Sequence, residues 1–309
     1  MKRTSPAPDP DLPALPALPG LFADPDLVEG DGRFYLYPTT DGFPGWSGTR
    51  FRVFSSPDLA GWKDEGVILD VATPAVPWAA GHAWAPAVAR RGGRWYFYFC
   101  AKRPDGVSCI GVADAPSPTG PFAARPEPLA TPELAAAGGI RLDQAIDPSV
   151  FFEDDGSAYL LFGNGGAAVA RLNADMISLA PGSLRQLEGA TDFREAVSVL
   201  KRRGLYHFTW SCDDTGSPDY HVNYGTAASL HGPIVFRYPV LQADPGRYIL
   251  GTGHHSILKP RDRDEYFIAY HRFATPLSDY PEGKGWHREV CVDRLEFGAD
   301  GLMLPVIHR

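Results

Sequence analysis

The feature that most constrains this chain is a unit that recurs five times along its 309 residues. Each copy has an apolar strand, a short polar turn and a second strand dense in Tyr, Phe and Trp. The copies are FADPDLVEGDGRFYLYPTTD from Phe22, AWAPAVARRGGRWYFYFCAK from Ala83, AIDPSVFFEDDGSAYLLFGN from Ala145, EAVSVLKRRGLYHFTWSCDD from Glu195 and GHHSILKPRDRDEYFIAYHR from Gly253. Such self-similarity is the sequence signature of repeat architectures, in which each unit is one supersecondary element.

Each unit holds a hairpin signal, as at Asp31-Gly32, Gly92-Gly93 or Arg203-Gly204, and offers further strand-like segments. About four short strands in roughly 50 to 60 residues is the pattern of a propeller blade. The 33 Gly, 30 Pro and 12% aromatic residues suit many turns between short aromatic-rich strands. The sequence therefore predicts an all-β, five-bladed β-propeller with about four antiparallel strands per blade. A β-sandwich with similar hairpins is the alternative, but it does not explain five matches in register.

We expect residues 1–20 to form a Pro-rich, extended N-terminal extension and residues 21–309 to form one propeller domain. Only the segment from Pro132 to Ala137 has the character of a helical turn. A parallel α/β sheet is excluded, because its strands need helical crossovers. The four cysteines form no CxxC pair, and we expect free thiols.

Acidic residues recur at one place in the unit. The first strand of each propeller blade lines the central channel, so equivalent residues near the starts of these strands converge. Aligning the five copies puts Asp24, Trp84, Asp147, Glu195 and His254 at this level. Either aspartate alone would be typical of a turn, because Asp-Pro is common there, and the glutamate alone of a solvated strand end. Three carboxylates at one repeat position instead indicate a site in the channel.

Three carboxylates in one channel meet the needs of sugar hydrolysis. One carboxylic acid must protonate the departing oxygen, and one carboxylate must activate water or attack the anomeric carbon. A third acidic group beside the acid can raise its pKa by like-charge repulsion. A sugar-binding propeller without catalysis is the alternative from another class, but it has little use for three mutually repelling acids. The trio favours a glycoside hydrolase.

With these motifs the chain, from Leu21 to Arg309, resembles glycoside hydrolase family 43. The resemblance implies that Asp24 in the ADP motif is the general base and that Asp147 in IDPSVF is the pKa modulator. It implies that Glu195, which opens EAVSVLKRRGLYHFTWS, is the general acid. This last motif departs from the commoner Glu-Gly-Pro wording at Ala196 and Val197, so its assignment depends more on register.

The resemblance further implies an inverting, exo-acting enzyme that removes terminal α-L-arabinofuranosyl or β-D-xylosyl residues from plant-type oligosaccharides. The runs DYHVNYGTAASLHGPI and YHRFATPLSDYPEGKGWHREVCVDRLEF are similar to the exo-acting branches. A β-D-galactofuranosidase stays open, because similar sugars differ by few contacts. For inversion, Asp24 and Glu195 should stand roughly 6.5 to 9.5 Å apart and leave room for a water.

Aromatic faces and planar, multi-donor side chains are expected to bind the sugar. Trp84 lies near the channel, and two of the other candidates lie in the loop TTDGFPGWSG. The predicted substrate-binding residues are Trp84, Phe43, Trp46, Asp41, Arg272 and Arg288.

No cofactor is expected for the chemistry. In the family a His at the GTGHHSIL position lies near an axial calcium or other ion, which points to His254 and, less directly, to His255. Calcium prefers oxygen ligands, so a site with one His and waters would be unusual.

The net charge of −8 argues against a nucleic-acid partner, which would require clustered Lys and Arg. The run YLLFGNGGAAVARLN is similar to a dinucleotide loop but lacks the helix and the parallel repeat of that motif. The chain start has no continuous apolar segment, and no later stretch approaches membrane-spanning length. We therefore expect a cytoplasmic protein without a membrane partner, whose oligomeric state is unknown.

Overall fold

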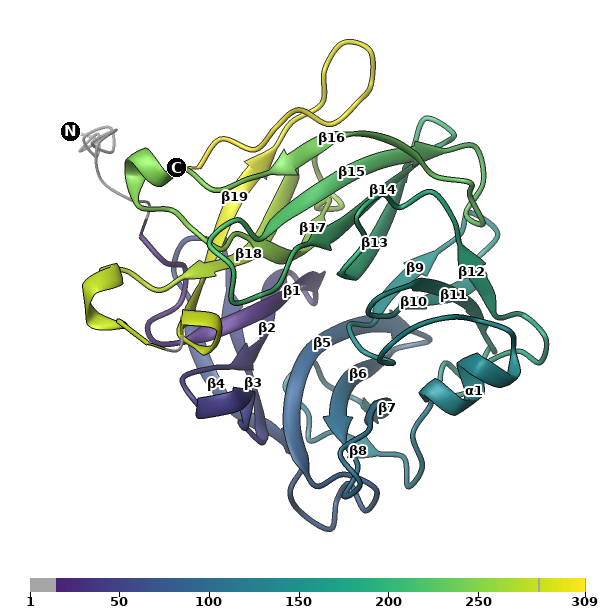
Figure 1. Cartoon of the computed structure of the whole chain (residues 1–309). Coiled ribbons are helices and arrows are strands. Elements are labelled where there is room, and N and C mark those ends of the chain that lie inside the picture. Colours follow the sequence, from purple (N-terminus) through teal and green to yellow (C-terminus); the bar gives the residue numbers. More distant parts are fainter. Residues whose placement is uncertain (1–14, 283, 309) are drawn as a thin grey trace.

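The five repeats form five antiparallel sheets around a central axis (Figure 1). The computed structural model describes residues 15–282 and 284–308, so residues 1–14 of the predicted extension lie outside the described residues. The strands, blade by blade, are β1 (Phe22–Gly30), β2 (Arg33–Thr40), β3 (Arg50–Ser56), β4 (Lys63–Asp70); β5 (Gly81–Arg91), β6 (Arg94–Lys102), β7 (Ser108–Ala115), β8 (Ala123–Ala124); β9 (Ser149–Phe152), β10 (Ala158–Phe162), β11 (Ala167–Leu172), β12 (Arg185–Leu187); β13 (Glu195–Arg202), β14 (Leu205–Cys212), β15 (His221–Ala227), β16 (Val235–Leu241); β17 (Gly253–Leu258), β18 (Tyr266–Phe273) and β19 (Arg288–Leu295). The predicted five-bladed propeller is confirmed; among the described residues, four blades have four strands and the fifth has three.

In the first, second and fourth blades two-residue turns join the first two strands, because residues that accept positive φ occupy them. Asp31 and Gly32 have φ of 51° and 74°, and Arg203 and Gly204 have φ of 52° and 78°. A two-residue loop with positive φ at both positions is a type I′ turn, whose twist matches that of the flanking strands. The hairpin positions predicted from the sequence are therefore confirmed.

Helices are few and short. The helix α1 (Pro132–Ala137) coincides with the predicted helical turn, and its N-cap Thr131 accepts a hydrogen bond from Leu134 N–H at 3.1 Å. The 3₁₀ segments are η1 (Pro44–Trp46), η2 (Pro245–Arg247), η3 (Leu277–Asp279) and η4 (Lys284–Trp286). Among the described residues, no helix has the length and apolar character needed to cross a membrane.

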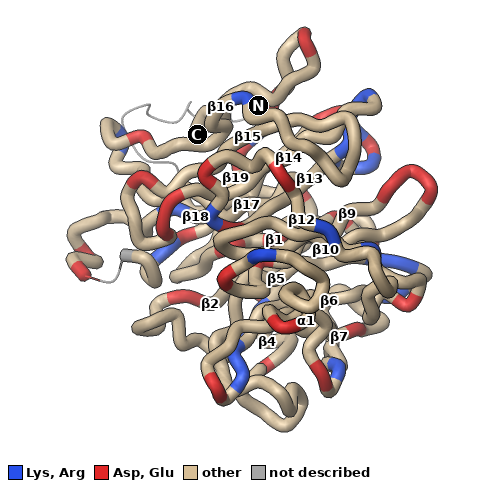
Figure 2. Tube along the Cα trace, turned by 45° about the vertical axis from the view of Figure 1, so that its right-hand side comes forward, with Lys and Arg blue, Asp and Glu red and all other residues tan. Residues whose placement is uncertain are grey.

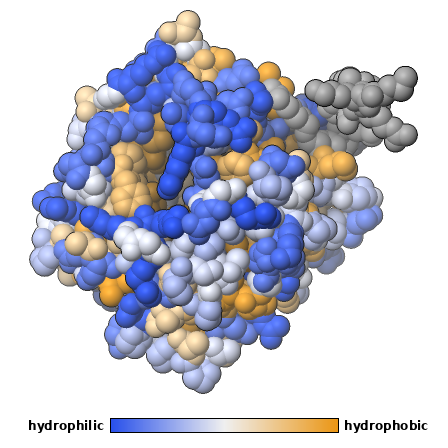
Figure 3. Space-filling model, turned by 180° about the vertical axis from the view of Figure 1, so that it is seen from behind, coloured by the Kyte–Doolittle hydropathy of each residue, from blue (hydrophilic) through white to orange (hydrophobic). Residues whose placement is uncertain are grey.

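Aromatic side chains fill the space between neighbouring blades. Trp95 and Trp210 are almost fully buried, and Gly30 lets the first blade approach Trp95, because a Cβ there would lie 2.2 Å from the indole ring. All four cysteines are free and buried, as expected. Figure 2 shows acidic and basic residues interspersed over the molecule, and Figure 3 shows one face that is mostly hydrophilic, with apolar residues in a hollow and in small areas.

The described end of the N-terminal segment packs between the first and fifth blades. Ala17 N–H donates to Val290 O of β19 at 2.7 Å. Leu18 is 1% exposed and belongs to a cluster that contains Phe22 of β1 and Ala269 of β18. The chain thus links its first and last blades before the first strand begins.

Candidate active site

A β-bulge near the start of four of the five inner strands places site residues; in the third blade Asp147 lies just before β9. In every blade one residue at this level adopts a left-handed conformation, with φ between 37° and 58°. These residues are Asp24, Ala85, Asp147, Ala196 and His254. Bulges interrupt the ladder at this point in the strand pairs β1–β2, β5–β6, β13–β14 and β17–β18, and they re-aim side chains toward functional sites.

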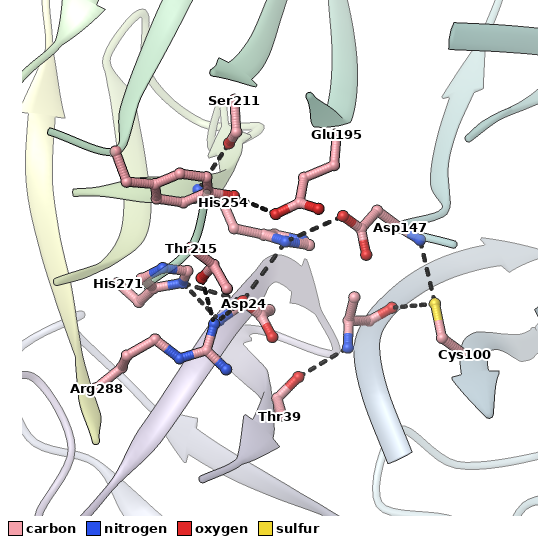
Figure 4. A network of polar contacts seen from close by, with 12 residues as sticks. Asp24, Thr39, Cys100, Asp147, Glu195, Ser211, Thr215, His254, His271 and Arg288 are labelled. Atoms are coloured by element: carbon pink, nitrogen blue, oxygen red, sulfur yellow. Dashed lines mark hydrogen bonds and ion pairs between the residues drawn. The ribbon is translucent and has the colours of Figure 1, made fainter. Parts of the chain in front are cut away.

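The bulge refines the alignment of the five repeats. Glu195 pairs with Ser211, and Trp84 pairs with Cys100. Each pair is the last one before the bulge that follows it. Glu195 and Trp84 are therefore one residue earlier than the level of Asp24, Asp147 and His254. Figure 4 nevertheless shows the three carboxyl groups around one space, with the His254 ring between Asp24 and Asp147.

The three carboxyl groups line a single cavity of about 350 Å³. Asp24 is 6% exposed, Asp147 5% and Glu195 9%. The cavity is also lined by Trp46 and Trp84. Buried carboxyl groups at this density interact strongly, so their partners determine which one is ionised.

Asp24 is held in its ionised form. Its Oδ1 lies 2.9 Å from Arg288 Nη1 and 3.0 Å from His271 Nδ1. Burial alone would raise the pKa of Asp24, but the Arg288 charge, followed by His254 and His271, outweighs burial and holds that pKa well below its usual range. Asp41 fixes the guanidinium, because its Oδ2 accepts from Arg288 Nε at 2.8 Å. Asp24 is thus a carboxylate that can accept a proton.

Glu195 and Asp147 have the opposite electrostatics. Burial raises the pKa of Glu195, although Tyr220 OH donates to its Oε1 at 2.8 Å and Asn164 Nδ2 donates to its Oε2 at 2.7 Å. Burial, then the charges of Glu195 and Asp24, raise the pKa of Asp147 well above its usual range. Two neighbouring buried carboxyl groups of this kind titrate as a pair, and their raised pKa values favour a proton held on that pair.

One cavity thus holds a carboxylate kept in its ionised form and a pair of carboxyl groups with raised pKa values. These are the groups that general acid–base hydrolysis of a glycoside needs. The family model "Glycosyl hydrolases family 43" matches residues 14–303. The chain belongs to glycoside hydrolase family 43. The resemblance inferred from the sequence is confirmed, and the chain is a glycoside hydrolase.

Relatives of family 43 match over nearly the whole chain. A β-D-galactofuranosidase of Aspergillus niger is 34% identical, with 94% of this chain and 84% of the relative covered. A xylosidase/arabinosidase of Bacteroides ovatus is 28% identical, with 94% and 96% covered. The crystal structure of the GH43_1 enzyme from Xanthomonas citri complexed with xylotriose is 30% identical, has a TM-score of 0.77, and covers 94% of this chain and 93% of that chain.

Family-43 chemistry needs no cofactor, and the predicted axial ion is a separate matter. His254 Nδ1 lies 3.5 Å from Asp24 Oδ1 and 3.6 Å from Asp147 Oδ2, and burial lowers its pKa to about 4. His255 is buried against Thr209 Oγ1 at 2.6 Å. Among the described residues no group of three or more His, Cys, Asp or Glu side chains could hold a metal ion. The side chains around His254 therefore do not form a calcium site by themselves, and the ion stays a prediction.

The structure sorts the predicted sugar-binding residues into three kinds. Trp84, Trp46 and Arg288 line the cavity, and Trp84 Nε1 donates to Trp46 O at 2.7 Å. Asp41 contacts Arg288 rather than the cavity. Phe43 is 44% exposed and packs beside Gly48, outside the residues that line the cavity.

Arg272 also lies outside the cavity, contrary to the role we expected. It is fully buried, and its Nη2 lies 2.7 Å from Glu289 Oε1. Side chains alternate along a strand, so the neighbouring His271 faces the site instead. His271, the residue before Arg272 in β18, contacts Asp24 Oδ1 at 3.0 Å.

Several residues at the site were not predicted from the sequence. Asn164 and Tyr220 contact Glu195, and His271 contacts Asp24. Lys102 and Arg194 line the cavity, with Lys102 Nζ 5.0 Å from the Trp84 ring centroid. Asn164 follows Gly163 in the run FGNGG. This glycine interrupts the repeat, and it was a signal in the sequence by which Asn164 could have been recognised as a site residue.

Proposed function

We propose that this family-43 chain is an inverting, exo-acting hydrolase that removes a terminal α-L-arabinofuranosyl or β-D-xylosyl residue from oligosaccharides. The observation that carries the proposal is the split of the carboxyl groups in one cavity. Asp24 is paired with Arg288 and ionised, whereas Glu195 and Asp147 have raised pKa values. This split is the condition for a base and an acid to act in one step.

In the proposed reaction a water attacks the anomeric carbon from the side opposite the leaving group. Asp24 takes a proton from that water, and Glu195 gives its proton to the glycosidic oxygen as the bond to the anomeric carbon breaks. The new carbon–oxygen bond forms on the opposite face, so the configuration inverts. Asp147 and Glu195 share one proton, and when Asp147 is ionised its like charge raises the pKa of Glu195, so that the proton is held by the acid.

The walls of the cavity support an exo-acting enzyme. The loop around η1 is held to η4, because Trp46 Nε1 donates to Gly285 O at 2.6 Å and the rings of Trp46 and Trp286 lie 5.3 Å apart. Arg288 Nη1 also donates to Thr215 Oγ1 at 3.2 Å, which joins the loop after β14 to the same wall. From these contacts we infer a wall on the Asp24 side that would admit a terminal sugar and stop a chain that continues past it.

The choice of sugar follows the relatives. The Bacteroides ovatus relative is a xylosidase/arabinosidase, and the Xanthomonas citri enzyme is complexed with xylotriose. Galactofuranose is a second candidate, because the Aspergillus niger relative, at 34% identity, is a β-D-galactofuranosidase. Rates on nitrophenyl arabinofuranoside, xyloside and galactofuranoside separate these sugars, and a binding module without catalysis would release nothing from any of them.

Glu195→Gln tests the assignment of the acid. The substitution keeps the shape of the side chain but removes the proton, so the rate on poor leaving groups should fall by roughly 100- to 10,000-fold. Aryl glycosides with very acidic phenols should lose much less. A loss that does not depend on the leaving-group pKa would mean that Glu195 binds the substrate rather than protonating it.

A further inference from the structure

Neighbouring blades are joined by a recurrent hydrogen bond at the level of the site. The left-handed residue of an inner strand turns its N–H away from its own sheet, and a side chain on the second strand of the preceding blade accepts it (Figure 4). The donor–acceptor pairs are Ala85 N–H to Thr39 Oγ1 at 2.7 Å, Asp147 N–H to Cys100 Sγ at 3.1 Å, His254 N–H to Ser211 Oγ at 3.0 Å and Asp24 N–H to His271 Nδ1 at 3.3 Å.

The four acceptors occupy one structural position. Each stands on the second strand of its blade, opposite the residue that precedes the bulge. The opposed pairs are Thr39 with Ala23, Cys100 with Trp84, Ser211 with Glu195 and His271 with Gly253. The contact is therefore a property of the repeat.

In the described part of the chain, the third and fourth blades lack this recurrent hydrogen bond to a side-chain acceptor. The residue at the acceptor position is Gly163, whose N–H donates to Ile146 O at 2.8 Å. Gly163 has a φ of 131°, and a Cβ there would lie 2.1 Å from Gly166 O. No side chain fits at this position, so the third blade offers no side-chain acceptor there for the N–H of Ala196, the left-handed residue of the fourth blade.

The residue after Gly163 crosses from the third blade to the fourth and reaches the carboxyl group of Glu195 instead. Asn164 is 2% exposed, lines the cavity, and its Nδ2 donates to Glu195 Oε2 at 2.7 Å. Its backbone is fixed on both sides, because Asn164 N–H donates to Gln144 O at 3.1 Å and Asp143 N–H donates to Asn164 O at 2.7 Å. A buried amide with a fixed backbone holds the carboxyl oxygen in one orientation.

We infer that Asn164 is a positioning residue for the general acid, Glu195. Between the third and fourth blades, its side-chain contact to Glu195 replaces the backbone hydrogen bond that joins the other neighbouring blades. The inference rests on the proposed function, in which Glu195 is the acid. Asn164 fixes Oε2 while Tyr220 fixes Oε1 at 2.8 Å, so each carboxyl oxygen has one donor. Donors to the charged form stabilise the anion that remains after proton transfer.

Asn164→Ala tests this role through the pH profile and the leaving group. Loss of a donor to the anion raises the pKa of Glu195, so the alkaline limb of kcat/KM should move to higher pH. The rate on poor leaving groups should fall more than the rate on acidic phenols, yet by less than the roughly 100- to 10,000-fold expected for loss of the acid itself. Asn164→Asp keeps the shape of the side chain and puts another carboxyl group beside Glu195, so it should move the limb in the same direction even if the alanine variant folds poorly.

Thr39→Val is the matched control, because it removes the acceptor at a joint whose left-handed residue is Ala85 and carries no carboxylate. It should lower stability and leave the alkaline limb in place. An alkaline limb at the wild-type pH in both Asn164 variants, with equal losses on all leaving groups, would overturn the inference. If Glu195→Gln itself shows no leaving-group dependence, the proposed function fails, and this inference fails with it.

Discussion

At the scale of single residues, Arg288 determines the state of the proposed base. Its guanidinium lies between Asp41 and Asp24, at 2.8 Å from Asp41 Oδ2 and 2.9 Å from Asp24 Oδ1, and its side chain is 3% exposed. Because the pKa of Asp24 in the folded protein lies below its unfolded value of about 4, this ion pair stabilises the fold above that pH. The contribution is lost as the pH falls toward the folded-state pKa.

Arg288→Met should therefore lower stability and alter the acid limb of the rate profile. It leaves Asp24 and Asp41 buried without their cation, which costs about 3–5 kcal/mol in comparable buried pairs. Burial then raises the pKa of Asp24, and the acid limb of kcat/KM should move to higher pH. Denaturant unfolding and a pH–rate profile measure the two effects.

Arg50→Met is the control for this prediction. Arg50 Nε makes a similar contact to Asp70 Oδ2 at 2.9 Å, but its side chain is 66% exposed. Exposed pairs contribute about 0–1 kcal/mol, so this variant should retain nearly all of its stability and its acid limb. Equal losses in the two variants would show that burial of the Arg288 pair has no special effect.

Which residues of the site could be predicted depended on the repeat. Asp24, Asp147 and Glu195 occur at or next to one repeat position, so the alignment found them without a structure. His271 and Arg272 are adjacent in β18 and both are polar, and the sequence contains no sign of which one faces the channel. Asn164 and Tyr220 lie in loops, where side-chain direction depends on contacts between blades.

At the scale of secondary-structure elements, the inner strands carry backbone strain at the bulge. Ala85 has a φ of 44°, whereas Ala87, two residues later in β5, does not have a positive φ. A left-handed conformation costs a non-glycine residue roughly 1–2 kcal/mol. The surrounding structure holds this conformation, since Ala85 N–H donates to Thr39 Oγ1 at 2.7 Å, and the adjacent Trp84 lines the cavity.

Ala85→Gly and Ala87→Gly form a matched pair that measures this strain. Both alanines are nearly fully buried in the same strand. Glycine in a strand costs about 0.5–1 kcal/mol and a lost buried methyl about 0.8 kcal/mol, so Ala87→Gly should lower the free energy of unfolding by about 1–2 kcal/mol. At Ala85 the relief of strain offsets this cost, and the variant should stay within about 0.5 kcal/mol of wild type. Equal destabilisation of the two variants would contradict the account of the bulge.

Elements were predicted better than their details. Alternation of turn signals and aromatic strands was sufficient for the blades, the hairpins and the helix α1. The bulge was not predicted, because the left-handed residues and those that follow them share no side-chain signal for this conformation. The dipeptides at this level are Asp-Pro, Ala-Pro, Ala-Val and His-His. As a result the predicted alignment placed Glu195 one residue away from its structural position.

At the scale of the whole molecule, closure of the propeller involves the segment that precedes β1. Leu18 lies between the first and fifth blades and is 1% exposed, whereas Leu15 is 89% exposed. Leu18→Ala should lower the free energy of unfolding by about 2–5 kcal/mol, as in other buried Leu→Ala changes. Leu15→Ala should change it by less than about 0.5 kcal/mol. If both variants unfold like the wild type, this segment has no part in closing the ring.

The whole molecule also sets the geometry of the proposed reaction, since Asp24 and Glu195 come from the first and fourth blades. We expect carboxyl groups from nonadjacent blades to leave space between them for a water, because inversion needs a separation of roughly 6.5–9.5 Å. A retaining enzyme needs roughly 5–5.5 Å and a covalent glycosyl intermediate. The two mechanisms release opposite anomers first.

Proton NMR of the first-formed product, recorded before mutarotation, tests the central claim most directly. If Asp24 activates a water while Glu195 protonates the leaving oxygen, the sugar first released has the anomeric configuration opposite to that of the substrate. An initial product with the configuration of the substrate would contradict the account, because it requires a glycosyl intermediate and removes Asp24 from the role of general base.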